Sequence, residues 1–233
     1  TLTKVINEIH RTPETLNKAP ERKKYAESDS DDPQVFFTNY DMVQAEIIFN
    51  HKGEQYDKSL TPEATLFNQY FGGDMSSIVF QEIREAQGLA YSVFSAYNQG
   101  AKTENNDRMM AYVGTQADKQ EEAMDAMMAL LNDLPESEKS FENAKKGILS
   151  NIESERITKT SVLFNYINSA DKGIDYDIRK DIYNKVKGMD FSDVKVFHQK
   201  YVKDKSYNIA VIGDENKINF RVLDKYGKVV KLS

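Results

Sequence analysis

The sequence predicts an α+β domain in which helices pack on one face of a mostly antiparallel β-sheet. Three observations lead to this expectation. Segments with strand-like alternation occur near both ends of the chain, and helical periodicity dominates the residues between them. A hydrophobic content of 39% over 233 residues is sufficient to fill a core. Strands at the two ends with helices gathered between them are typical of a sheet covered by helices on one side.

The first 34 residues are expected to precede this domain, which runs over residues 35–233. Leu2, Val5, Ile6 and Ile9 share one face of a helix predicted over residues 1–11. Residues 12–34 contain three prolines and an acidic run, so we expect a solvated linker with no recognition role and with high protease sensitivity. Because the chain starts at Thr1 within the helical pattern, without a methionine or signal peptide, it is interpreted as a piece of a longer polypeptide.

The first elements of the domain have clear local signals. Residues 35–50 alternate between apolar and polar side chains and are predicted to form a strand. Thr61-Pro62-Glu63 combines a capping threonine, a proline and an acidic first turn, which predicts a helix over about 62–71.

A second helix is predicted over residues 76–87. Met75, Ile78, Val79 and Ile83 have the spacing of one buried face, and Asp74, Ser76 or Ser77 can cap the helix, which ends at Gly88. Strands near 89–97 and 108–115 follow, and the polar loop between them suits an antiparallel hairpin. Arg84 and Tyr91 would therefore flank one corner between helix and strand.

Helical patterns dominate the second half of the chain. Helices are predicted near residues 119–134, 137–158, 161–171, 177–187, 190–203 and 217–225, and strands near 207–212 and 228–232. The first of these helices has a methionine-rich face, which we expect to pack in the core.

Composition excludes several classes of function. The net charge of −6 argues against the basic surface that a nucleic-acid partner requires, and no apolar run is long enough to span a bilayer. The chain contains no cysteine, which excludes disulfides and thiolate metal ligands but leaves the cellular compartment open.

Sequence motifs for catalysis are also missing. A chain without cysteine needs histidines and carboxylates at a tight spacing, such as His-x-x-Glu-His, to hold a catalytic zinc ion. His10, His51 and His198 occur singly in different segments and are interpreted as surface or structural residues. There is no Gly-x-Ser-x-Gly, and Gly72-Gly73 matches neither phosphate-binding motif. We therefore expect no catalytic residue and no metal ligand in this chain.

One stretch, YFGGDMSSIVFQEIREAQGLAYSV over residues 70–93, resembles the non-catalytic C-terminal half of the pitrilysin/insulinase zinc peptidases, the inverzincins. The tail INFRVLDKYGKVVKL, preceded by NIAVIGDENK, is similar to how domains of that family end. The resemblance spans about residues 36–233. It implies two homologous halves that close like a clamshell around a peptide substrate, with zinc and the general base in the N-terminal half.

The resemblance also carries implications for individual residues. The helix that holds the zinc motif in the catalytic half corresponds here to Leu66-Phe67-Asn68-Gln69-Tyr70, which cannot bind zinc. An Arg and a Tyr seven residues apart are implied to hydrogen-bond the bound peptide near the scissile bond, and Arg84 and Tyr91 have that spacing. From the residues alone, a salt bridge or packing at the core edge explains them as well, but the resemblance favours substrate binding.

These observations predict the zinc-free C-terminal half of a zinc metalloendopeptidase. No cofactor is expected in this chain, no peptide cleavage by the chain alone, and zinc in a catalytic half that is part of the same polypeptide or a partner subunit. The alternative is a non-enzymatic peptide-recognition or structural subunit of the same fold. The two hypotheses differ in whether the polypeptide upstream of Thr1 contains His-x-x-Glu-His.

Overall fold

A single mixed β-sheet organises the chain. The computed structural model describes residues 2–10, 13, 15–21, 23, 25 and 27–232. The sheet has six strands in the order β3-β4-β2-β5-β1-β6. In chain order they are β1 (Gln34–Asn39), β2 (Gln44–Gln55), β3 (Ser92–Asn98), β4 (Asn106–Gln116), β5 (Asn208–Gly213) and β6 (Lys228–Leu232).

Strand pairing is antiparallel on one side of the sheet and parallel on the other. The pairs β3·β4, β4·β2 and β2·β5 are antiparallel, whereas β1 runs parallel to both β5 and β6. The expectation of a mostly antiparallel sheet in an α+β domain is therefore confirmed. The parallel pairs arise because β1, from the start of the domain, lies between two strands from its end.

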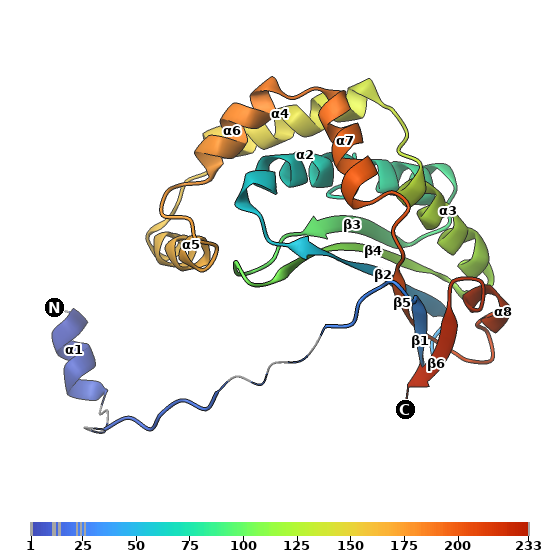
Figure 1. Ribbon diagram of the computed structural model, residues 1–233, viewed down its shortest axis with the longest axis horizontal. Helices are drawn as coiled ribbons and strands as arrows, with labels where there is room; N and C mark the ends of the chain where they lie inside the picture. Colours follow the sequence, from blue (N-terminus) through green and yellow to red (C-terminus); the bar gives the residue numbers. More distant parts are fainter. Residues whose placement is uncertain are drawn as a thin grey trace.

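Helices cover one face of this sheet (Figure 1). The covering layer consists of α2 (Thr61–Phe71), α3 (Gln120–Asn132), α4 (Glu138–Ser154), α6 (Arg179–Gly188) and α7 (Phe191–Tyr201). The remaining helical segments are α1 (Leu2–Ile9), η1 (Lys58–Leu60), the π-helix η2 (Phe80–Ala86), η3 (Ala117–Lys119), α5 (Lys159–Asp171) and α8 (Phe220–Leu223). The opposite sheet face carries none of these five helices, and we call it the helix-free face.

The core lies between the sheet and this helix layer. On β2, Ala45, Ile47 and Phe49 are buried toward the helices, and the residues between them face the other side. Met124 and Met127 of α3 are fully buried in the same core. The expected packing role of the methionine-rich helix face is thus confirmed.

The predicted strand over residues 35–50 is in fact two strands. β1 and β2 pair with opposite sides of β5, so the chain leaves β1, crosses the end of β5 and enters β2. Tyr40 and Val43 lie in this crossing and are exposed. The polar residues Asn39 and Asp41 interrupt the apolar positions at this crossing, and the prediction of a single strand did not take this interruption into account.

The predicted helix over residues 76–87 also differs in detail. Regular helical structure begins at Ile78, and Met75 is 71% exposed rather than part of the buried face. Asp74 accounts for the difference, because its side chain accepts hydrogen bonds from the Ser76 N–H at 2.7 Å and the Ser76 hydroxyl at 2.7 Å. This turn holds Met75 outside the helix. Ile78, Val79 and Ile83 are buried as expected.

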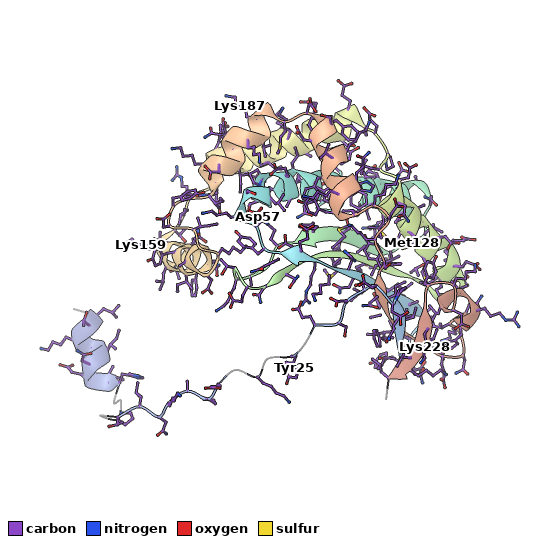
Figure 2. All side chains as sticks on the ribbon, in the orientation of Figure 1. Tyr25, Asp57, Met128, Lys159, Lys187 and Lys228 are labelled. Carbon is purple, nitrogen blue, oxygen red and sulfur yellow. The ribbon has the colours of Figure 1, made fainter. Side chains whose placement is uncertain are left out.

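Two helices stand apart from the layered body. No residue of α1 or α5 is buried. α5 begins at Lys159, which Figure 2 labels at the side of the molecule away from α3 and α8. The helix predicted over 1–11 is present from Leu2 to Ile9, and residues 1, 11, 12, 14, 22, 24 and 26 lie outside the described residues. Within the described ranges, no helix is long and apolar enough to cross a membrane.

Candidate functional site

The corner between η2 and β3 has a firmly held backbone. Gly88 has a φ of +62°, a left-handed conformation that glycine adopts without steric cost. The Leu89 N–H donates to the Ile83 carbonyl at 3.0 Å, and the Leu89 carbonyl accepts from the Thr115 hydroxyl at 2.6 Å. The Tyr91 N–H donates to the Gly114 carbonyl on β4 at 2.9 Å. The corner is thus bonded to both the helix before it and the sheet beside it.

Arg84 and Tyr91 lie together at this corner, as their spacing predicts. The Arg84 guanidinium carbon is 5.9 Å from the centroid of the Tyr91 ring and 4.8 Å from that of Phe80. Two aromatic rings therefore hold the guanidinium by cation–π contact. The nearest carboxylate is that of Glu85, whose Oε1 lies 3.9 Å from the Arg84 Nε. At that distance, and with both side chains solvated, this pair contributes little to stability.

Both side chains are accessible to a ligand. Tyr91 is 74% exposed, and the Arg84 side chain is 40% exposed. Within the described part of the chain, neither the Tyr91 hydroxyl nor the Arg84 guanidinium has a hydrogen-bond partner. The corner accordingly presents six N–H and O–H donors, five on the guanidinium and one on the phenol, on a bonded backbone.

The resemblance aligns helix α2 with the zinc-binding helix of a catalytic half, but here this helix contributes its side chains to the core. Leu66, Phe67 and Tyr70 are almost completely buried. Phe67 stacks on Phe71 and on Phe197 of α7, with ring centroids 5.1 and 5.0 Å apart. The Tyr70 hydroxyl donates to the Pro135 carbonyl at 2.7 Å, and burial raises the pKa of this tyrosine to about 12. These side chains do not fit a metal ion.

Asn68, on the same helix, bonds to β3, a contact that was not predicted from the sequence. The Asn68 side chain accepts a hydrogen bond from the Tyr97 N–H at 2.7 Å and donates to the Tyr97 carbonyl at 3.0 Å. One turn later, the Gly72 carbonyl accepts from the Ser95 N–H at 3.3 Å. A Cβ on Gly72 would lie 2.1 Å from the Ser95 Oγ, so only glycine permits this approach. The outer edge of β3 is therefore bonded to α2.

A polar and aromatic cluster on the helix-free sheet face was also missed. The Tyr112 hydroxyl donates to the Glu46 carboxylate, and burial, followed by that carboxylate, raises the pKa of Tyr112 to about 12. The Phe94 ring stacks on Tyr112 with centroids 5.0 Å apart. A Cβ on Gly114 would meet the Tyr112 hydroxyl at 2.8 Å. Gly114 thus connects this cluster to the Tyr91 backbone. Only cross-strand register, which the sequence does not provide, brings these residues together.

The scattered histidines do not form a metal site. His198 is buried, its Nε2 lies 2.9 Å from the Leu131 carbonyl, and burial lowers its pKa. The Nδ1 of His51 lies 2.9 Å from the Ser206 carbonyl, and burial lowers its pKa too. His10 is exposed. Among the described residues, no group of three or more His, Cys, Asp or Glu side chains could hold a metal ion.

Two larger hollows lie elsewhere on the molecule. Cavities of about 510 and 540 Å³ adjoin the connection between α5 and α6, and neither is lined by Arg84 or Tyr91. The first is an open space between this connection and α5, a helix that buries no residue. It has no convergent set of catalytic groups, so the corner of Arg84 and Tyr91 remains the candidate site.

Comparison with known proteins places the chain among peptidase-like domains. Residues 2–148 match the family described as "Peptidase M16 inactive domain". The chain is 30% identical over 106 residues to the uncharacterized zinc protease YmxG of Bacillus subtilis (strain 168). That similarity covers 44% of this chain and 25% of the Bacillus protein.

Solved structures show the same fold. A crystal structure of a peptidase M16 inactive domain from Pseudomonas fluorescens superimposes with a TM-score of 0.70 and 17% identity, covering 88% of this chain and 49% of that chain. A protease from Helicobacter pylori gives a TM-score of 0.66 and 13% identity, covering 91% of this chain and 52% of that one. The chain therefore spans about half the length of these solved proteins and a quarter of the Bacillus relative.

Proposed function

This chain belongs to the peptidase M16 inactive-domain family, and from that premise we propose that it is the zinc-free half of a two-half zinc metalloendopeptidase. Zinc and the general base would then reside in the other half, as part of the same polypeptide or as a partner subunit. Two observations support the proposal. The solved proteins of this fold are about twice as long as the matched region. The side chains of α2 build the core and do not fit a metal.

The contribution of this half would be to bind the backbone of a peptide substrate. A peptide enclosed between two halves loses water, so its carbonyl oxygens need donors from the surrounding protein. Arg84 and Tyr91 can supply such donors, because both are exposed and neither has a hydrogen-bond partner among the described residues. This accessible pair on one bonded corner is the observation that carries the proposal.

The geometry of the corner favours stabilisation of a transition state over simple attraction of substrate. The backbone on both sides of Gly88 is bonded to η2 and to the sheet, and aromatic rings hold the guanidinium. Donors held in this way need little reorganisation as negative charge develops on a carbonyl oxygen. Their role would be to position the peptide and to stabilise that charge.

The test is made in the peptidase with both halves present. Tyr91→Phe removes only the hydroxyl and keeps the ring, and Arg84→Ala removes the guanidinium. Each is expected to lower kcat/KM by roughly ten- to a hundredfold, because a hydrogen bond to a charged or dry site contributes about 1.5 to 3 kcal/mol. Zinc content and melting temperature should stay near the parental values.

Tyr40→Phe is the matched control, because Tyr40 is another exposed tyrosine, outside this corner. It should leave kcat/KM unchanged. Parental kcat/KM values in both corner variants would show that the pair is structural and would remove the site assignment. If neither the upstream polypeptide nor a partner subunit contains His-x-x-Glu-His, the chain is instead part of a non-catalytic peptide-recognition or structural assembly.

A further inference from the structure

The acidic part of the predicted linker is bonded to the sheet. We call residues 27–30 the acidic strap. The Glu27 Oε1 lies 2.5 Å from the Arg108 Nη2 on β4, and the Asp29 Oδ1 lies 2.7 Å from the Lys52 Nζ on β2. Figure 1 shows the chain reaching the sheet from the side opposite the helix layer. Residues 27–30 are therefore in contact with the sheet and are not surrounded by water alone.

The two cations that hold the strap are direct neighbours across the sheet. Lys52 and Arg108 are partners in the register between β2 and β4. Like charges placed directly opposite on neighbouring strands repel each other and destabilise the pairing. Glu27 and Asp29 supply one carboxylate to each cation. The acidic strap therefore neutralises a repulsion that the sheet would otherwise contain.

Polar contacts beyond the ion pairs fix the strap. Ser30 is only 4% exposed, and its Oγ lies 3.4 Å from the Lys52 backbone nitrogen, which donates to it. The Asn208 Nδ2 donates to the Asp29 carbonyl at 3.4 Å, and the Asn208 Oδ1 accepts from the Gln34 N–H at 3.0 Å. A single asparagine on β5 thus connects the strap to the first residue of β1.

The strap also forms one wall of a shallow groove on the helix-free face. The groove has a volume of about 290 Å³. Its lining combines Glu27 and Ser28 of the strap with the apolar sheet residues Phe36, Ile48 and Ala210.

We infer that Lys52, Arg108 and Asn208 form a docking site for an acidic extended peptide segment, and that its occupant is residues 27–30 of this chain. The domain accordingly begins at Glu27 and not at Val35, eight residues earlier than the sequence predicts. A connection to an upstream half would be anchored on the sheet by charge, and its attachment would weaken as ionic strength rises.

Cleavage of the full chain by a glutamyl-specific protease tests this inference. Glu27 lies in the strap, whereas the exposed Glu21 precedes it and serves as an internal reference. The rate of cleavage after Glu27 divided by the rate after Glu21 therefore reports how often the strap leaves the sheet. In the parent the ratio should be well below one. Lys52→Gln or Arg108→Gln should raise it about three- to fivefold and the double variant about tenfold, because each ion pair lost makes undocking more frequent.

Lys231→Gln is the control with the same change in charge, because it breaks the ion pair between Lys231 and Glu215, outside the docking site. It should leave the ratio unchanged. Raising NaCl from about 0.05 to 0.5 M should raise the ratio in the parent but not in the double variant. An equal ratio in the parent and the double variant would overturn the inference.

A charge exchange separates strap release from general unfolding. Lys52→Glu alone should expose Glu27 to cleavage, and Lys52→Glu combined with Asp29→Lys should restore protection by at least about threefold, because the ion pair is re-formed in reverse. Failure of the exchange to restore protection, with melting temperatures near that of the parent, would also overturn the inference. The test uses this chain alone and is independent of peptidase activity.

Discussion

Helix α2 and the corner between η2 and β3 are close in sequence but use their polar side chains in opposite ways. In α2, Asn68 bonds to the chain's own backbone on β3, and its apolar neighbours are buried. At the corner, Tyr91 is 74% exposed, and its hydroxyl has no partner among the described residues. The polar group of α2 is thus used within the fold, whereas the donors at the corner stay unpaired among the described residues, as the proposed substrate-binding role requires.

Asn68→Ala should have the largest effect on stability among the changes that test this contrast. It removes two hydrogen bonds and leaves the N–H and carbonyl of Tyr97 without their partner. We expect the free energy of unfolding to fall by about 2 kcal/mol, measured by urea denaturation. Gln69→Ala is the control and should cost less than about 0.5 kcal/mol, because the Gln69 side chain bonds only to the exposed Asp74. Equal effects of the two variants would break the contrast.

The core also contains a buried carboxylate, on β4, whose protonation is coupled to folding. Asp107 is fully buried, and its Oδ1 accepts a hydrogen bond from the Gly100 N–H at 2.8 Å. Burial raises the pKa of Asp107 above its usual value, so the native chain binds the proton more tightly than the unfolded chain. The contribution of this group to stability is therefore greatest below the unfolded pKa and falls as the pH rises through the raised pKa.

Asp107→Asn should consequently melt higher than the parent at pH 7, by no more than about 4 °C, and the difference should shrink toward pH 4. Circular dichroism melts at pH 4, 5.5 and 7 measure this. A difference in melting temperature that is the same at all three pH values would contradict the assignment.

The smallest effect on stability is expected at the corner itself. Tyr91→Phe should change the free energy of unfolding by less than about 0.5 kcal/mol, because the hydroxyl is solvated and the ring contact with Arg84 is kept. Urea denaturation of the isolated chain measures it. A loss above about 1 kcal/mol would mean that the hydroxyl supports the fold, and the contrast with α2 would disappear.

Local signals in the sequence predicted much of the fold. Pro62 and Glu63 marked the start of α2, Gly88 marked the end of η2, and the strands at both ends of the chain were found within a few residues. The break between β1 and β2 was missed although Asn39 and Asp41 interrupt the apolar positions, and no local signal indicates that β5 lies between the two strands. Met75 was misplaced because the Asp74 turn competes with the helix for the same backbone groups.

The candidate site was predicted only in part. The spacing of Arg84 and Tyr91 around one glycine, together with the family resemblance, was sufficient to predict that they lie at one corner. The contact of Asn68 with β3 depends on tertiary packing between a helix and a strand edge, for which one sequence carries no signal. The ion pairs of the acidic strap were not predicted, because its charge is evident locally, whereas its partners, Lys52 and Arg108, lie on strands further along the chain.

Helix α5 also affects how the chain behaves in concentrated solution. Five of its apolar side chains are between 44% and 66% exposed: Val162, Leu163, Phe164, Tyr166 and Ile167. No charged residue lies between Lys159 and Asp171 at its two ends, so nothing on the helix itself repels a neighbouring molecule. Exposed apolar surface of this kind favours self-association. We therefore expect α5, together with the exposed apolar residues Leu2, Val5, Ile6 and Ile9 of α1, to limit the solubility of the chain in isolation despite a net charge of −6.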